Sequence, residues 1–223
     1  MKQIKSISNI LYMLGLISFS TASLGNIEPT EKLWRFKVFL DDSAIGYHQF
    51  SLKQQAGIQT LHIKAEFDVK FLFINVYSYR HDNIETWNGD CLASLSSNTD
   101  DNGDAIFVRI NKQDDDQIIE TPSGSTLVNT CLRSFAYWNP DLLKSGQLLN
   151  AQNGDLIDVD FIRIGTESLT FNDTRIPSDR YRLQGKDLEI DLWYSADKEW
   201  LGLQSTTENG SKLRYVLQQK ASQ

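Results

Sequence analysis

Histidine and cysteine are scarce in this sequence, which has three histidines and two cysteines in 223 residues. The patterns HExxH, CxxC and H-x-H are absent, which excludes the common zinc-site spacings. The stretch PSGS, Pro122–Ser125, lacks the G-x-S-x-G spacing and the following helix of a serine-hydrolase nucleophile elbow. A glycine-rich phosphate loop is also missing. The sequence therefore predicts no metal site and no cofactor.

Long hydrophobic runs are missing as well. The apolar run Ile10–Phe19 has ten residues, whereas a membrane-spanning helix needs about 20. Lys2 and Lys5 precede this run and the small residues Ser20–Ser23 follow it, which is the order of a signal peptide. A buried N-terminal helix is the alternative. We expect residues 1–25 to be a cleaved signal peptide and the mature protein to be soluble, without a membrane span, in the periplasm or outside the cell.

Basic residues are fewer than acidic ones in this sequence. Without Lys2 and Lys5, 20 basic side chains face 29 acidic ones, which gives a net charge of −9. A chain this acidic is repelled by phosphate backbones and by anionic lipid surfaces. We therefore expect no nucleic-acid partner.

The two cysteines, Cys91 and Cys131, can pair in an oxidising compartment. A bridge between them closes a loop of about 40 residues, which the chain-entropy treatment values at roughly 3–4 kcal/mol. The sequence does not show whether their Cα atoms lie within reach of each other. Two buried free thiols are the alternative. A catalytic cysteine is less favoured, because no histidine lies near either one in the sequence.

Asn-Gly pairs, by contrast, occur four times, each between runs of alternating or β-branched residues. Asn-Gly suits the type I′ turn of a β-hairpin, because both central residues take a positive φ there. One pair lies in SSNTDDNGDA, Ser96–Ala105, which also resembles a calcium loop. An EF-hand aligned on Gly103 places Arg109 where a bidentate glutamate is required, so we reject it. A hairpin is the favoured interpretation. The alternative is a calcium site of another type formed by three aspartates, Asp100, Asp101 and Asp104.

Residues 26–223 are predicted to form one all-β domain. Many short segments alternate apolar and polar residues with the period of a strand, as QTLHIKAEFDVK does. One segment is typical of a helix, since Asn139 can cap it, Pro140 suits its first position and Gly146 ends it. Many antiparallel strands protect their edges by stacking as two sheets or by curling. We predict a single antiparallel β-barrel or half-barrel of many short strands with one short helix.

The stretch FLFINVYSY, Phe71–Tyr79, is apolar on both faces of its pleat, which is typical of a strand between two hydrophobic layers. We expect the short helix near Pro140 or a bound apolar ligand to cover it. Aromatic residues with polar groups suit a cavity that is apolar inside and wet at its rim. The alternative is that the aromatics form the core of the domain. The residues predicted to line a ligand site are Phe67, Phe71, Tyr77, Tyr79, Trp87, Tyr137 and Trp138.

His81 is the histidine with the most polar chemistry close to it in the sequence. If its strand bends back at Asp82–Ile84, His81 and Glu85 face each other and can act as a general acid–base pair. The candidate catalytic residues are His81, Glu85 and Asp100. The alternative is a histidine at the rim of the domain that is hydrogen-bonded to a carboxylate, because no third group completes a site.

Three stretches of the sequence resemble a known family. They are YSYRHDNIETWNGDCLASLSSNTDDNG, SFAYWNP and DLWYSADKEWLGLQSTTENGSKLRYVL. The family is an uncharacterised domain of unknown function found in exported, β-rich proteins of Gram-negative bacteria. The resemblance implies an antiparallel β-barrel or half-barrel over nearly all of the mature chain. It implies no activity and no catalytic residue.

Together these observations predict an exported β-barrel-like protein that binds an apolar or lipid-like molecule, or an envelope protein, without catalysis. The alternative is an enzyme that acts on a cell-envelope substrate with a His81/Glu85 acid–base pair. The two hypotheses differ in what they require of the interior, since one needs an apolar cavity and the other a positioned polar pair.

Overall fold

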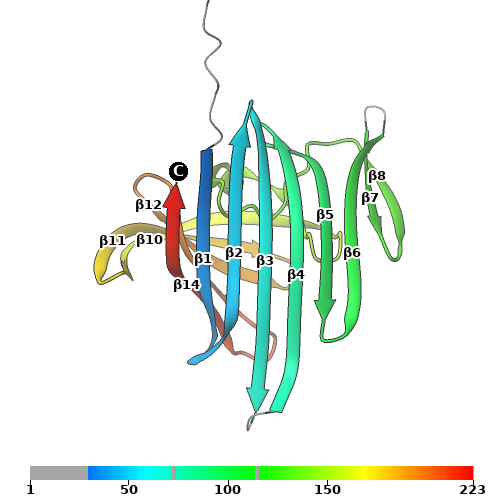
Figure 1. The fold of residues 1–223 in the computed structure, drawn as a ribbon. Helices are drawn as coiled ribbons and strands as arrows, with labels where there is room; N and C mark the ends of the chain where they lie inside the picture. Colours follow the sequence, from blue (N-terminus) through cyan, green and yellow to red (C-terminus); the bar gives the residue numbers. More distant parts are fainter. Residues whose placement is uncertain (1–29, 72–73, 114–115, 223) are drawn as a thin grey trace, which may run out of the picture.

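The computed structural model describes residues 30–71, 74–113 and 116–222 (Figure 1). The predicted signal peptide, residues 1–25, lies outside them. The described chain forms one sheet of 14 strands, in the order β8-β7-β6-β5-β4-β3-β2-β1-β14-β13-β12-β11-β10-β9. Neighbouring strands are antiparallel throughout. The first and last strands pair with each other, so the two ends of the domain meet in the middle of the sheet.

The strands of the first half of the chain are β1 (Thr30–Leu40), β2 (Ser43–Gln55), β3 (Ile58–Phe71), β4 (Ile74–Asn88), β5 (Cys91–Asp101), β6 (Asp104–Gln113), β7 (Asp116–Thr121) and β8 (Gly124–Val128). The elements of the second half are the 3₁₀ helix η1 (Pro140–Lys144), β9 (Gln147–Leu149), β10 (Leu156–Phe171), β11 (Thr174–Gly185), β12 (Leu188–Ser195), β13 (Trp200–Thr206) and β14 (Lys212–Ser222). Several strands are longer than predicted. In particular, the strand that carries His81 and Glu85, β4, has 15 residues.

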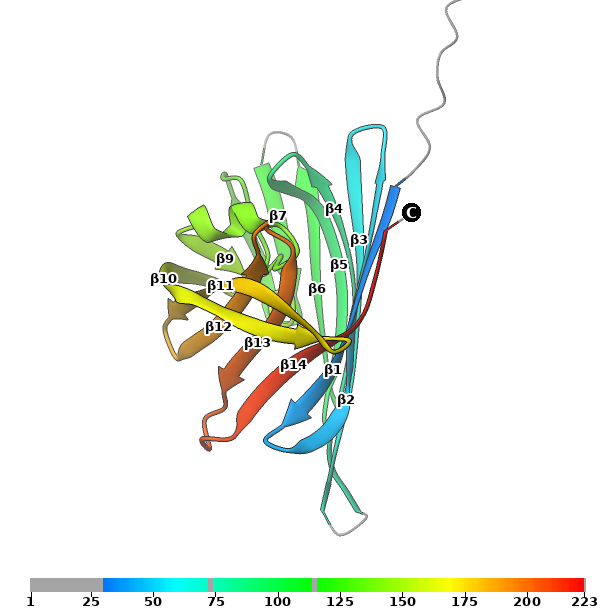
Figure 2. The same cartoon turned by 90° about the vertical axis from the view of Figure 1, so that its left-hand side faces the viewer.

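The sheet is a half-barrel, as predicted. It curls so that β1–β6 form one wall and β10–β14 the other, with η1 between the walls at one end (Figure 2). It does not close, because β8 and β9 stand at its two edges instead of pairing with each other. The side chains on the concave face meet in the space between the walls, and this is where the core lies.

The hairpin interpretation of the Asn-Gly pairs is confirmed, since all four lie in connections between antiparallel neighbours. Asn102 and Gly103 both have positive φ, 55° and 100°, as a type I′ turn requires. At the other three pairs only the glycine has a positive φ. Asp100 Oδ1 accepts a hydrogen bond of 2.7 Å from the Gly103 amide. The acidic stretch around Gly103 thus forms a turn.

The space between the two edge strands is crossed by residues 129–146, here named the crossover segment. Its beginning is attached to β5 by the Cys91–Cys131 disulfide, which has a Cα–Cα distance of 5.1 Å, and the Leu92 amide donates to the Leu132 carbonyl at 2.8 Å. Pairing of the two cysteines is therefore confirmed. Further on, Ser134 forms a parallel bridge with Leu149 of β9. The segment joins the two walls across the open side of the half-barrel.

The short helix of the crossover segment has the predicted start. The Asn139 side chain accepts from the Asp141 amide, Pro140 begins the helix, and Leu142 is buried. It is a 3₁₀ helix of five residues. Next to it, Trp138 packs edge-to-face against Trp87 with ring centroids 5.9 Å apart. The helix therefore anchors the segment in the core.

The expected covering of the FLFINVYSY stretch is wrong for one face of its described part, whereas Tyr79 on the other face is only 7% exposed. Ile74 and Val76, at the start of β4, are 67% and 53% exposed. They lie where β3 and β4 extend beyond the neighbouring strands (Figure 1). Pro140 lies instead in a hollow beside Trp34 and Leu52. Ile74 and Val76 thus stand at the exposed end of a long hairpin, where none of the described residues buries them.

Candidate ligand cavity

A cavity of about 240 Å³ lies between the two walls of the half-barrel. One side is formed by inward side chains of β2, β3 and β4, and the opposite side by those of β12, β13 and β14. Ser134, Phe135 and Tyr137 of the crossover segment, the loop 150–152 and Ile157 of β10 complete the lining. The cavity therefore depends on both walls and on the segment that joins them.

Most of the cavity surface is apolar. Because side chains alternate along a strand, each wall presents every second residue to the cavity. The aliphatic and aromatic residues that line it include Phe50, Ile63, Leu188, Ile190, Leu203 and Leu213. Tyr79, Tyr137 and Tyr215 add aromatic rings with a hydroxyl group. Such a surface favours an apolar molecule over water.

One strand breaks this pattern. On β4 the inward positions His81, Asn83 and Glu85 are polar and only 7%, 0% and 1% exposed. We name these three residues the polar row. Ile84 faces outward between them and is 45% exposed. The alternation of apolar-in and polar-out is thus inverted on β4, and all three residues of the polar row line the cavity.

The polar row is held by neighbouring side chains. His81 Nδ1 lies 2.9 Å from Thr99 Oγ1 of β5. The Asn83 amide nitrogen donates to Glu85 Oε1 at 2.9 Å, and Trp87 Nε1 donates to Glu85 Oε2 at 3.0 Å. Both carboxylate oxygens of Glu85 therefore have a donor from the same strand, which fixes the row in one conformation.

Burial controls the charge of these groups. Desolvation lowers the pKa of His81 to about 4, and the nearby Asp82 carboxylate only partly opposes this effect. Burial also raises the pKa of Glu85, although the neighbouring Asn83, Ser134 and Trp87 side chains act in the opposite direction. The His81 imidazole is consequently neutral at pH 7.

A second histidine lines the cavity from β2. His48 Nδ1 lies 3.0 Å from the Tyr215 hydroxyl of β14, and the imidazole stacks on Phe50 with centroids 4.3 Å apart. Burial lowers the pKa of His48 to about 3, with a smaller contribution from His81. His48 was not among the predicted residues, because its partner lies 167 residues away and no local pattern connects the two.

Two polar atoms in the cavity lining have no hydrogen-bond partner. They are Asn83 Oδ1 of β4 and His48 Nε2 of β2. Buried polar atoms in proteins are nearly always paired, and an unpaired one costs about 1–3 kcal/mol. The cavity therefore offers hydrogen bonds that the described chain does not use.

The structure brings His81 and Glu85 to the same cavity but not into contact. The pairing of β4 with β3 and β5 continues through Asp82–Ile84, so the strand does not bend back there. Four residues along a strand span about 13 Å, and Asn83 lies between the two. Asn83 was not among the predicted residues, although the same alternation that places His81 and Glu85 inward also identifies it.

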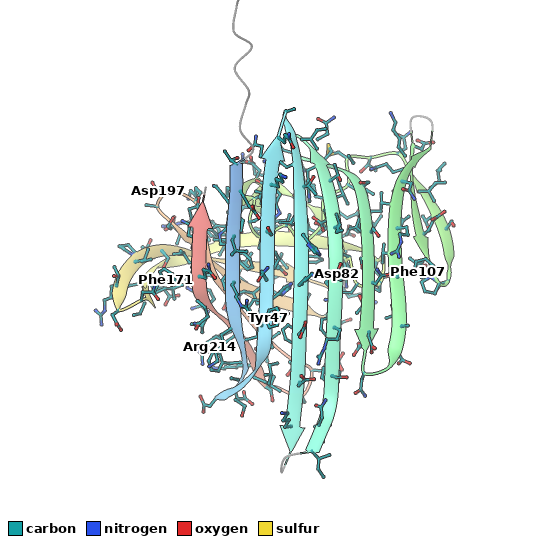
Figure 3. The ribbon with its side chains drawn as sticks, in the orientation of Figure 1. Tyr47, Asp82, Phe107, Phe171, Asp197 and Arg214 are labelled. Atoms are coloured by element: carbon teal, nitrogen blue, oxygen red, sulfur yellow. A yellow bond between two sulfur atoms is a disulfide. The ribbon has the colours of Figure 1, made fainter. Side chains whose placement is uncertain are left out.

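Asp100 lies on the other face of the sheet. It is the Cα partner of Arg80, whereas its neighbour Thr99 faces inward beside His81. Asp82 is also on this outer face, which Figure 3 shows with the side chain labelled, and its carboxylate lies 3.6 Å from Lys64 Nζ. The three predicted catalytic residues thus do not converge, since adjacent strand positions point to opposite faces.

The predicted ligand-lining residues divide into three groups. Tyr79 and Tyr137 line the cavity. Phe67 stacks on Tyr79 at 5.3 Å and belongs to a small core cluster beside the cavity, against which Tyr77 packs. Trp87 and Trp138 are part of the main core. The side chain of Phe71 lies outside the described part of the structure.

Among residues 30–71, 74–113 and 116–222, no three histidine, cysteine, aspartate or glutamate side chains are arranged to hold a metal ion. In the same residues no helix has the length and apolar character needed to cross a bilayer.

Comparison with known proteins places this fold among uncharacterised relatives. Residues 36–218 match a family described as a domain of unknown function (DUF6134). No curated protein matches the chain. A crystal structure of a β-barrel-like protein of the domain of unknown function DUF1849 from Brucella abortus is similar, with a TM-score of 0.63 and 7% sequence identity. The match covers 87% of this chain and 98% of that one. At this identity the likeness concerns the fold alone.

Proposed function

The chain belongs to the DUF6134 family of domains of unknown function, and from its interior we propose an exported, non-enzymatic protein that binds a small apolar or lipid-like molecule. The observation that carries this proposal is the cavity of about 240 Å³ between the two walls. A protein interior is normally packed with few voids larger than a water molecule. A mostly apolar cavity of this size can hold a small apolar molecule.

The volume limits the size of the ligand. An apolar protein cavity of about 150 Å³ holds benzene, which has six heavy atoms. In proportion, 240 Å³ accommodates roughly ten heavy atoms. This corresponds to a short acyl chain or a substituted aromatic ring, and it is much smaller than a whole phospholipid.

Two features support an exported location. The first residues of the sequence have the order of a signal peptide. The Cys91–Cys131 disulfide attaches the crossover segment to β5, and such bridges persist in oxidising compartments. An envelope protein as a partner stays an untested prediction.

An acid–base enzyme is the second candidate, because His81 and Glu85 line the same cavity. The geometry gives this candidate less support, since each residue is hydrogen-bonded to a different neighbour. Complementation of a deletion strain tests it directly. The enzyme hypothesis in this form is refuted if His81→Ala restores every phenotype of the deletion.

Native mass spectrometry of the mature protein, purified from its own export compartment without detergent, tests the binding proposal. We expect an added mass that leaves in organic solvent. Ser205→Phe projects a ring into the cavity from β13, so it should remove this mass. Thr206→Phe is the matched control, because Thr206 is exposed on the opposite face of the same strand. The bare chain mass in the wild type, together with no binding of added apolar probes, contradicts the proposal.

A further inference from the structure

The unpartnered atoms of the cavity indicate which chemical group its ligand carries. Asn83 is completely buried. Its amide nitrogen is engaged by Glu85, and its Oδ1 has no donor. An amide oxygen only accepts hydrogen bonds. A group that binds at this position therefore has to donate one.

The surroundings of Asn83 reinforce this requirement. The neighbouring Glu85 carboxylate also accepts hydrogen bonds. On the crossover segment, Ser134 is 2% exposed, and its hydroxyl acts on the Glu85 carboxyl by lowering its pKa. A serine hydroxyl can both donate and accept. Next to Asn83 the cavity thus presents the acceptors of Glu85, while the hydroxyl groups elsewhere in the lining can take either role.

The charge of the ligand follows from the rest of the lining. A carboxylate ligand would share a desolvated space with Glu85 and find no positively charged side chain among the residues that line the cavity. A cationic ligand would lose its hydration against mostly apolar walls. The same desolvation already disfavours the charged forms of His48 and His81. An uncharged donor is the remaining class.

We propose that the cavity binds a neutral amphipathic molecule of roughly ten heavy atoms whose hydroxyl or amide group donates a hydrogen bond to Asn83 Oδ1. This inference rests on the proposed binding function and specifies its ligand class. It predicts that binding discriminates between molecules of equal size by the presence of a donor.

Two isomeric probes isolate the donor. 1-Octanol and 1-methoxyheptane have the same composition and nearly the same shape, but only the alcohol donates a hydrogen bond. Isothermal titration of the full mature chain should give 1-octanol a dissociation constant about tenfold lower or more, since an unsatisfied buried acceptor is costly. Octanoate and octylammonium at pH 7 should bind more weakly than 1-octanol.

Point variants distinguish the requirement for a hydrogen-bond donor from binding in the cavity as such. Asn83→Leu removes the acceptor at similar volume, so it should abolish the preference for the alcohol while the ether still binds. The comparison of probes on the wild-type chain remains decisive if this variant fails to fold. Ser205→Phe should weaken both probes, and Thr206→Phe should weaken neither.

The outcomes are distinct. Equal affinities of alcohol and ether, both weakened by Ser205→Phe, overturn the donor requirement but leave the binding function standing. Tighter binding of either charged probe than of 1-octanol overturns the neutral class. If neither probe binds, the cavity is not a ligand site and both proposals fail.

Discussion

The buried histidines should make the fold sensitive to acid. His81 has a pKa of about 4 in the folded protein and His48 about 3, whereas both titrate near 6.5 in an unfolded chain. As the pH falls below 6.5, the unfolded chain takes up protons that the folded protein cannot bind. Stability from these two groups is therefore complete above about pH 7 and is lost on acidification toward pH 4.

The magnitude follows from the same values. Between pH 7.5 and 4.5, linkage gives a loss of roughly 2.5 kcal/mol for each histidine, or about 5 kcal/mol for both. Glu85 acts in the opposite sense. Its pKa is raised on folding, so the folded protein holds its proton to higher pH and gains stability on acidification. The net loss is accordingly smaller than the histidine contribution alone.

Urea unfolding at pH 7.5, 6.0 and 4.5 measures this dependence, with fluorescence of the five tryptophans as the signal. His81→Gln keeps a polar group beside Thr99 and should remove about half of the histidine contribution. His62→Gln is the control, because the His62 side chain is 40% exposed on the outer face. A free energy of unfolding with the same pH dependence in the wild type and in a His48→Gln/His81→Gln double variant refutes the reasoning.

Three further predictions concern stability alone, each measured by urea unfolding at pH 7.5. Replacing Cys91 and Cys131 by serine should lower the free energy of unfolding by roughly 4 kcal/mol, because the bridge closes a long loop; an unchanged midpoint contradicts this. Asp191→Asn should lower the free energy of unfolding by about 3 kcal/mol, because Asp191 is 5% exposed and pairs with Arg180 and Arg182. A loss below about 1 kcal/mol, the value typical of surface ion pairs, contradicts this. Gly46→Ala should unfold the protein or destabilise it by more than about 2 kcal/mol, because a Cβ at this position would lie 1.8 Å from the Glu66 carbonyl oxygen of β3. Gly146→Ala is the control and should be nearly neutral, because its Cβ would meet nothing within 4 Å.

Much of the architecture could be predicted from local sequence. Alternation identified strands such as β3, and Asn-Gly pairs marked four of the connections. These signals are local, because the direction of a strand side chain and the φ of a turn residue depend on near neighbours. The same alternation was sufficient to add Asn83 to the polar row, but the prediction for this strand assumed a bend that does not exist. The separation of Asp100 from His81 depends on the register between β4 and β5, which local alternation does not give.

The sequence by itself determined a curled antiparallel sheet with one short capped helix and two cysteines able to pair. Only the tertiary structure decided that β1 pairs with β14, that the crossover segment joins the walls, and that His48 meets Tyr215 inside. The physical reason is distance along the chain. Pairing of remote strands is set by burial of a shared concave face, which depends on all of the strands together. The cavity exists only where those remote faces meet without filling the space between them.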